Sequence, residues 1–441
     1  MEKEINSSGE VDDFMGAFDL AEEGYSKDAS MVKAIDPWDV SGNVSYSRTY
    51  NTIKDKPPTG VPDDRHWASS KLTTNLKLKY RFSDDLYLKL NGHAFKDEAY
   101  RVNGRSEYSQ EFLDAYEEEV EVDEFFVSYR ASSWLNVALG KQIVVWGTSD
   151  NLRVVDVINP LDNREPGLND IENVRVAADM MKVDIQLYDW LLTGLIVTEI
   201  EKDKEPVLGS QYYPFDTPQP PLVNPESEGK DKYEFGASLS GKVLMVDVSA
   251  YYADYYKNQA NFYWQEGLPF PIRHLADLTM FGLTGTTAIG DWVYKSELAH
   301  IDGLNFSSGQ GHDFSRVDLM LGVEYYGLTN ASIALETVYQ KITDFVPFIA
   351  NSLELPGESE RSFAFRFSGD YFHDTVHFLF LALMSGPLGE DGNIIRISMD
   401  YDLQDAVTVG LETAFFGGGA DVAFDYLSDN DQVSANMKYS F

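Results

Sequence analysis

The chain has 441 residues, and its 72 acidic and 35 basic residues give a formal net charge of −37 at pH 7. This charge argues against a nucleic-acid partner, because phosphate binding requires clustered lysine and arginine. The chain has no cysteine, which excludes a disulfide framework, a thiol nucleophile and cysteine-ligated metals.

The hydropathy of the chain limits its fold class further. The mean hydropathy is −0.30, and no run approaches the roughly 20 apolar residues that a membrane helix needs. The longest apolar stretch, residues 376–384, is interrupted by His377 and has the length of a strand. Aromatic residues make up 13% of the chain. These properties suit either a soluble β protein or a β-barrel.

Residues 1–37 form an acidic N-terminal segment that differs from the rest of the chain. Residues 1–10 lack the apolar core of a secretory signal, so we expect the numbering to be that of a mature or recombinant chain. Val11, Phe14, Met15 and Phe18 recur at helical spacing and predict a short amphipathic helix. The segment either plugs a lumen, docks on a periplasmic rim or binds a partner, or it is a poorly ordered acidic leader.

Residues 38–441 read as a succession of amphipathic strands. Successive side chains of a strand point to opposite faces, so a strand with one apolar face alternates apolar and polar residues. The alternation is clear in residues 75–82, 86–91, 181–187, 317–324 and 363–368. The predicted strands that contain these runs are about ten residues long, which is close to the length that a tilted strand needs to cross a bilayer.

Two kinds of connection separate these strands. Short ones carry turn residues, at 83–85, 131–133, 189–190, 241–242, 290–291, 328–330, 373–374 and 404–405. Longer polar segments alternate with them, at 51–66, 101–116, 147–172, 201–230, 255–271, 303–312, 344–357, 385–391 and 416–430. Strict alternation places all long loops on one side, which is typical of a membrane barrel with short periplasmic turns and long outer loops.

The last strand resembles the insertion signal of bacterial outer-membrane barrels. Apolar residues alternate along 431–441, and Met437, Tyr439 and Phe441 would form that signal. Aromatic residues also gather beside the short turns, as expected of a girdle at a membrane interface. We therefore predict an all-β fold, an up-and-down antiparallel transmembrane barrel of about 18 strands, with about 16 as the alternative. A soluble β protein is the competing interpretation.

A barrel of this size leaves an interior that side chains alone do not fill. The phase opposite the apolar residues carries both signs of charge, which either pair across the wall as structural contacts or form a selectivity ladder for a charged solute. The predicted lumen-facing charges are Lys77, Lys79, Arg81, Lys89, Glu124, Lys182, Asp184, Asp247, Lys295, Glu297, Asp318, Glu324, Glu336, Arg366, Arg396, Glu412 and Lys438.

One long loop, residues 140–170, is the predicted constriction. Loops of this length are usually functional or disordered, and its Asn-Pro-Leu-Asp turn favours order. The candidate residues are Gln142, Trp146, Arg153, Asn159, Asp162 and Arg164. The runs GKQIVVWG and VINPLDN resemble a pattern of a porin-like outer-membrane family of unknown function. That family is distantly similar to alginate-export and substrate-specific 18-stranded porins.

The resemblance implies envelope transport of a hydrophobic or lipid-like molecule, with a periplasmic carrier and an RND-type exporter as partners. Residues 191–197 and 378–384 are apolar on both phases. They either line the lumen with apolar surface or contact an inward loop or the N-terminal helix. The loop at 202–230, rich in proline and tyrosine, reads as a solvated lid or an aromatic patch.

Catalytic and cofactor signals are weak in this sequence. It contains no Gly-x-Ser-x-Gly, His-Glu-x-x-His or phosphate-cradling glycine loop, and we expect no enzyme activity, no resident metal and no cofactor. The acidic stretches 114–124 and 425–431 are candidates for binding a divalent cation, or they are solvated faces.

The predicted function is therefore passage of a solute across the bacterial outer membrane, among outer-membrane lipids and lipopolysaccharide, after insertion by the barrel-assembly machinery. A hydrophobic or lipid-like cargo is narrowly preferred. The alternatives are a diffusion porin for small polar or anionic solutes, and an outer-membrane hydrolase or structural barrel.

Overall fold

The computed structural model describes residues 37–52, 66–169, 171–214, 218–223, 233–263, 271–309, 311–352, 357–420, 422–428 and 430–441. The amphipathic helix predicted around residues 11–18 lies outside these residues. Within the described ranges, no helix has both the length and the apolar character needed to cross a membrane.

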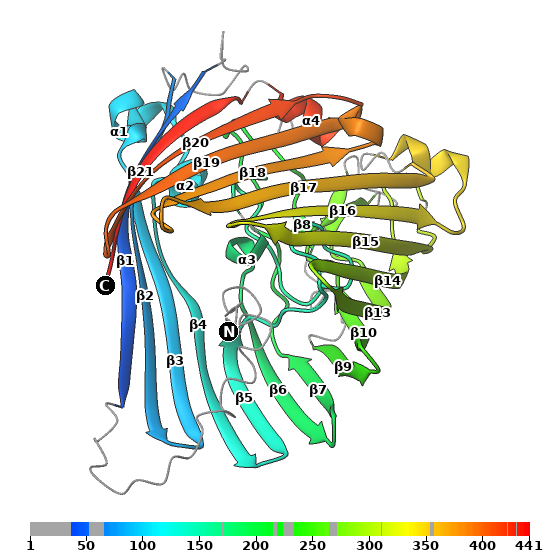
Figure 1. Cartoon of the computed structure of the whole chain (residues 1–441). Coiled ribbons are helices and arrows are strands. Elements are labelled where there is room, and N and C mark those ends of the chain that lie inside the picture. Colours follow the sequence, from blue (N-terminus) through cyan, green and yellow to red (C-terminus); the bar gives the residue numbers. More distant parts are fainter. Residues whose placement is uncertain are drawn as a thin grey trace, which may run out of the picture. The chain divides into compact units, whose positions relative to one another are not determined.

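Eighteen strands form one antiparallel sheet that closes on itself. Each strand pairs with the next strand of the sheet along the chain, in an up-and-down order (Figure 1). The strands are β1 (Trp38–Asn51), β2 (Trp67–Ser83), β3 (Leu86–Asp97), β4 (Glu118–Ser132), β5 (Leu135–Gln142), β6 (Ala178–Leu187), β7 (Trp190–Val197), β9 (Glu234–Val243), β10 (Val246–Tyr256), β13 (Asp277–Ile289), β14 (Trp292–Leu304), β15 (Phe314–Leu328), β16 (Ala331–Ile342), β17 (Ser359–Tyr371), β18 (Val376–Ser385), β19 (Gly392–Gln404), β20 (Val407–Gly417) and β21 (Gln432–Ser440).

The barrel closes where the last strand meets the first. β21 pairs with β1 from Asn43 opposite Ser440 to Asn51 opposite Gln432. The backbones of Gly42 and Phe441 exchange two further hydrogen bonds of 2.9 Å each. Closure leaves no strand edge unpaired in the ring, which is the condition for crossing a bilayer with strands. The predicted fold class and strand number are confirmed.

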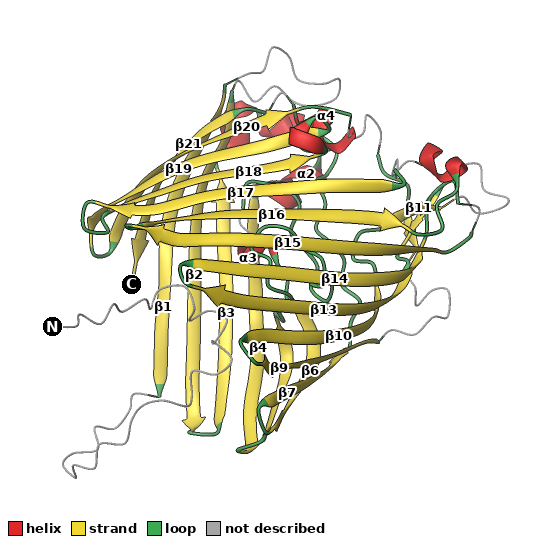
Figure 2. Ribbon diagram, turned by 45° about the vertical axis from the view of Figure 1, so that its right-hand side comes forward, coloured by secondary structure: helices red, strands yellow, loops and turns green. Residues whose placement is uncertain are grey.

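The short connections lie at one end of the barrel and the long ones at the other, as predicted (Figure 2). One predicted turn is wrong. The chain turns at Leu244 and Met245, whereas Gly241 stays inside β9 opposite Trp190 of β7. A Cβ atom on Gly241 would lie 2.5 Å from the indole ring of Trp190. The glycine therefore makes room for an aromatic ring within the sheet.

The two faces of the wall differ in the way that the alternation predicts. On β15, Leu319 and Leu321 are exposed on the outer face, whereas Met320 between them is fully buried inside the barrel. The aromatic residues beside the short turns are largely exposed on the outside, among them Trp134, Tyr439 and Phe441.

Small elements decorate the long connections. They are the helices α1 (Ala99–Asn103), α2 (Gln110–Tyr116), α3 (Ile171–Val174) and α4 (Val422–Leu427), the 3-10 turns η1 (Arg105–Glu107), η3 (Pro347–Asn351) and η4 (Pro387–Gly389), and a three-stranded sheet of β8 (Leu222–Val223), β11 (Asn261–Tyr263) and β12 (Ile272–His274). Of these, α3 lies inside the ring of strands in both views (Figures 1 and 2).

Candidate functional site

The connection from β5 to β6, residues 143–177, folds into the barrel, and we call it the inward loop. Two side chains tie its base together. Asn159 Oδ1 accepts the backbone N–H of Val144 at 2.8 Å, and Asn159 Nδ2 donates to the carbonyl of Val176 at 2.9 Å. Gln142 Nε2 donates to the carbonyl of Met180 on β6 at 3.2 Å. The amide side chains therefore replace the backbone pairing that ends with β5.

Trp146 is buried between the inward loop and the wall. Its ring centroid lies 5.1 Å from that of Tyr251 on β10. A Cβ atom on Gly236 of β9 would lie 3.0 Å from the same indole. Like Gln142 and Asn159, Trp146 is at most 5% exposed. These three predicted constriction residues are thus packing and hydrogen-bonding elements of the loop, and a passing solute would not touch their side chains.

Glu297 on β14 is the first of two buried carboxylates that hold the loop to the wall. It is 2% exposed. It accepts the backbone N–H groups of Thr148, of Ser149 at 2.9 Å and of Val155 at 3.3 Å. A buried carboxylate is costly unless it is hydrogen-bonded, so these three donors account for its position inside the barrel.

Glu336 on β16 is the second of these carboxylates and is 1% exposed. It accepts the backbone N–H groups of Asp150 at 2.8 Å and Asn151 at 3.0 Å. Asp150 also forms an ion pair of 2.6 Å with Lys295, which pairs in turn with Glu324 on β15. Three adjacent strands therefore hold the residues around Asp150.

Apolar packing fills the space between the inward loop and this side of the wall. One buried cluster joins loop residues to lumen-facing residues of the strands from β6 to β16. Leu195 and Val197 of β7 belong to it, so this apolar stretch contacts the inward loop. The loop contributes Val144, Trp146, Val154, Val155 and Ile158, and the wall contributes, among others, Met180, Tyr251, Met280, Ala299, Met320 and Val338.

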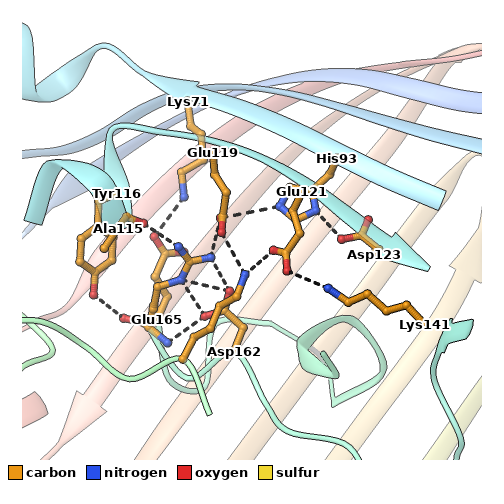
Figure 3. Close-up of polar contacts among 12 residues, drawn as sticks. Lys71, His93, Ala115, Tyr116, Glu119, Glu121, Asp123, Lys141, Asp162 and Glu165 are labelled. Atoms are coloured by element: carbon orange, nitrogen blue, oxygen red, sulfur yellow. Dashed lines mark hydrogen bonds and ion pairs between the residues drawn. The ribbon is translucent and has the colours of Figure 1, made fainter. Parts of the chain in front are cut away.

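The later part of the inward loop is held by charged residues of other strands (Figure 3). Arg164 forms ion pairs of 2.7 Å with Glu119 on β4 and 2.6 Å with Asp162. Glu165 pairs with Lys71 on β2 at 3.1 Å. Burial opposes the charge on Arg164, but its contacts with Asp162 and Glu119 outweigh that effect and raise the pKa of the guanidinium.

These contacts show that the inward loop crosses the lumen. In the ring of strands, β2 and β14 are nine positions apart in either direction, so Lys71 and Glu297 lie on opposite walls. Leu168 adds a third contact, because it packs against the cluster around Ile394 on β19. The loop fills the side of the lumen bounded by β6 to β16 and reaches the far wall only near the end with the long loops.

Lys204, from the connection after β7, completes the charged network. Its ammonium contacts Glu119 at 2.9 Å and also Glu121. His93 Nδ1 donates to Asp123 Oδ1 at 2.6 Å. His93, Glu119 and Glu121 offer ligand atoms within 4.8 Å of one another. Lys204 already supplies a cation between the two glutamates, so the predicted divalent-cation role of the stretch 114–124 gains no support here.

Two further charged residues are held within the loops. The predicted residue Arg153 donates to the carbonyl of Asn159 at 3.0 Å and pairs with Asp156 at 3.4 Å. Asp203 accepts the backbone N–H of Leu161 at 2.8 Å. Burial raises the pKa of the Asp203 carboxyl, and that hydrogen bond partly offsets the shift.

In the second acidic stretch, the Asp431 carboxylate accepts the backbone N–H of Phe416 at 2.8 Å.

The predicted lumen-facing charges all lie on the phase opposite the exposed apolar residues. Many form ion pairs along the wall: Lys89–Glu124 at 2.6 Å, Lys182–Asp184, Asp247–Lys242 and Arg396–Glu412 at 3.3 Å each, Arg316–Asp318 at 2.7 Å, and Lys295–Glu324. Five of the predicted lumen-facing basic side chains have no ion pair within the part of the chain that the structure describes, namely Lys77, Lys79, Arg81, Arg366 and Lys438.

The wall that the inward loop leaves uncovered, at β21, β1 and β2, is polar and mostly uncharged. At the short-turn end Lys77, Arg81 and Lys438 are exposed although they face the lumen, so this mouth is open to solvent. Above them runs a set of hydroxyl and amide side chains, which we call the polar lane: Ser41, Asn43, Ser45, Ser47, Thr49, Thr73, Asn75, Ser434 and Asn436.

Residues that sequence reasoning missed share one property. Lys71, Glu165, Lys204 and Asp203 act through partners on distant strands or loops, and nothing in their local pattern distinguishes them from solvated charges. Glu297 and Glu336 were expected to face the lumen, but their role in holding the loop has no local signal either.

The closed 18-stranded antiparallel barrel matches the fold of outer-membrane porins. The chain is similar to Acinetobacter baumannii OccAB3, with a TM-score of 0.53 and 8% identity over 92% of this chain and 99% of that one. It is similar to Pseudomonas aeruginosa OccK2 (OpdF), solved in complex with glucuronate, with a TM-score of 0.51 and 12% identity over 92% and 96%.

The chain belongs to the family described as "Protein of unknown function (DUF1302)", whose model matches residues 64–441. No curated protein matches the chain significantly. Membership of a family of unknown function and the porin-like fold agree with the general resemblance, whereas neither tests the particular pattern of GKQIVVWG and VINPLDN.

Proposed function

We propose that this protein is a channel of the bacterial outer membrane that admits small polar solutes. The observation that carries the proposal is the inward loop, which is held on opposite walls by Lys71 and Glu297. A loop fixed in this way fills one side of the lumen and leaves the other side as the route. In a purely structural barrel, by contrast, packed side chains would fill the lumen on all sides.

The proposed route follows the polar lane from the open short-turn mouth toward the long loops. Hydroxyl and amide groups can replace the hydrogen bonds between a polar solute and water, and no charged side chain has to lose its hydration when they do so. Lys77, Lys79 and Arg81, which form no ion pair with any described residue, lie at the mouth and would attract anions there. The geometry thus supports the polar or anionic alternative over the cargo that the sequence narrowly preferred.

A hydrophobic or lipid-like cargo remains the second candidate, because one strand favours it. On β18, Leu379, Leu381 and Leu383 occupy the lumen-facing phase, and Leu381 lies directly between Arg366 and Arg396 of the neighbouring strands. An apolar row flanked by guanidinium groups suits an amphiphilic anion. Coupling to a periplasmic carrier and an RND-type exporter belongs to this candidate.

A non-enzymatic role is part of the proposal. Among the described histidines with carboxylate neighbours, His93 and His377 are engaged on both ring nitrogens. His377 Nδ1 lies 2.6 Å from Asp370 and its Nε2 lies 3.1 Å from Asp402. A histidine held in this way has no free nitrogen to accept a proton from a nucleophile.

Single-channel conductance in a planar bilayer tests the proposal. The full-length chain is compared with a chain beginning at Ile35. Ohmic current from the full-length chain, unchanged by added long-chain fatty acid, supports a channel for polar solutes. Current only after truncation identifies the N-terminal segment as a plug and favours partner-driven transport. Silence from both chains, with both folded as barrels, overturns the channel.

A further inference from the structure

A cavity of about 120 Å³ lies where the polar lane meets the inward loop. Its floor is the lumen face of β1, β2 and β21, through Ser47, Lys71 and Gln432. Its other walls come from α1, α2, the inward loop and residues 209–212 of the connection after β7. On the proposed route, a solute that leaves the polar lane toward the long loops meets this cavity.

Aromatic side chains form one wall of the cavity. Tyr100, Tyr108, Phe112 and Tyr116 pack together, with neighbouring ring centroids 4.8–5.1 Å apart. Tyr212 enters from a different connection and is 7% exposed. Burial raises the pKa of the Tyr212 and Tyr116 hydroxyls, so both stay protonated donors at any physiological pH.

Polar groups form the opposite wall. Tyr212 donates from its hydroxyl to Gln432 Oε1 at 3.3 Å, which leaves the Gln432 amide N–H groups to face other acceptors. Ser47 contributes a hydroxyl from β1. The Lys71 ammonium is neutralised by Glu165 at 3.1 Å, so the cavity offers both a charged donor and a charged acceptor without a net charge.

The size and the lining together select a ligand class. An apolar cavity of about 150 Å³ holds a benzene ring, so this smaller cavity, which opens to the lumen, receives one face of a six-membered ring while the outer substituents of the ring stay in the polar lane. Aromatic faces on one side and paired donors and acceptors on the other suit a ring with both C–H and O–H groups. The internal Lys71–Glu165 pair favours a neutral ring over an anion, because an anion would have to displace Glu165.

We propose that this cavity is a binding site for a single neutral pyranose ring, at which a sugar pauses during passage. The proposal rests on the channel function above and names its substrate class. Binding in the cavity would block the route through the polar lane for as long as the sugar stays.

The test uses the full-length protein in a planar bilayer with methyl α-D-glucopyranoside as the probe. We expect the sugar to interrupt the open-channel current. Ser47→Leu places a side chain in the cavity and weakens the interruption by about tenfold or more. Ser41→Leu is the matched control, since it lies on the same strand and face, six residues or about 20 Å nearer the short turns, and the interruption persists.

Calorimetric titration of the same sugar into detergent-solubilised protein separates the two hypotheses. If the channel conducts, the sugar does not interrupt the current and the titration shows no heat of binding, the sugar site is overturned and the channel function is retained. No current, but binding that Ser47→Leu abolishes, upholds the site and overturns the channel. Tighter binding of D-glucuronate than of the neutral glycoside shows that the cavity selects anions, and overturns the proposed class. Tyr212→Phe provides a second variant that keeps the ring and removes only its hydroxyl.

Discussion

Lys71 and Glu297 lie on strands nine positions apart around the ring, and both hold the same inward loop. Glu297 fixes the backbone at Thr148 and Ser149, whereas Lys71 fixes the carboxylate of Glu165. The residues between these two points therefore form a bridge across the lumen. A bridge held at both ends narrows the barrel without depending on the stiffness of the loop itself.

Release of the bridge from β16 should widen the route. Glu336→Ala removes the acceptor of two backbone N–H groups, and each buried donor left without a partner costs about 1–3 kcal/mol. We expect a higher single-channel conductance and faster proteolysis within residues 143–177. Glu412→Ala, on the lumen face of β20, is the control. Unchanged conductance and proteolysis would show that Glu336 does not hold the loop.

The close contact between Gly241 and Trp190 predicts a steric effect within the sheet. Gly241→Ala brings a methyl group against the indole and should lower the free energy of unfolding by about 1–3 kcal/mol. Gly194→Ala on the neighbouring strand is the control, since a Cβ there has nothing within 4 Å. Thermal unfolding in detergent measures both. Equal midpoints for the two variants would contradict the packing.

The basic side chains at the short-turn mouth predict the ion selectivity of the channel. Replacing Lys77 and Lys79 by Gln removes two positive charges from the lumen face of β2. The reversal potential in a salt gradient should shift toward cation selectivity at low ionic strength and lose that shift at about 1 M salt, where screening is strong. Lys242→Gln, already paired with Asp247, is the control and should shift it less.

Asp203 predicts a pH dependence of the loops. Its pKa in the folded protein is raised by burial, so the folded state holds the proton more tightly than the unfolded chain. The protonated carboxyl stabilises the fold at low pH, and this contribution is lost as pH rises through the raised pKa. Hydrogen exchange at Leu161 should therefore slow as pH falls toward that value, after correction for intrinsic rates.

Asp203→Asn is the matched variant for this prediction. Its amide oxygen still accepts from the Leu161 N–H, but it has no charge to bury. We expect protection at Leu161 that no longer changes over this pH window. The same pH dependence in the variant would assign it to other charges near the site, such as Arg153, Glu205 or Lys257.

The sequence by itself determined the barrel. Alternation with a period of two placed Leu319 and Leu321 outside and Met320 inside, and it assigned the lumen-facing charges to their phase. The alternation of short and long connections determined which ends lie together. These signals are local, because the face of each residue depends only on its place in its own strand. The prediction of a turn at Gly241 was wrong for the same reason. The glycine is explained by its contact with Trp190 on the neighbouring strand, and the local pattern around Gly241 does not contain that contact.

The tertiary structure alone decided what the inward loop touches. Gln142 and Asn159 carry a recognisable local pattern, but Glu297 and Glu336 follow the loop by well over a hundred residues, and Lys71 precedes it. The two residues of each contact lie far apart along the chain, and no repeating pattern in the sequence indicates that they meet. Which side of the lumen is filled and which is left to a solute follows from those contacts. The route is therefore a property of the closed ring, in which distant strands face one another across a common interior.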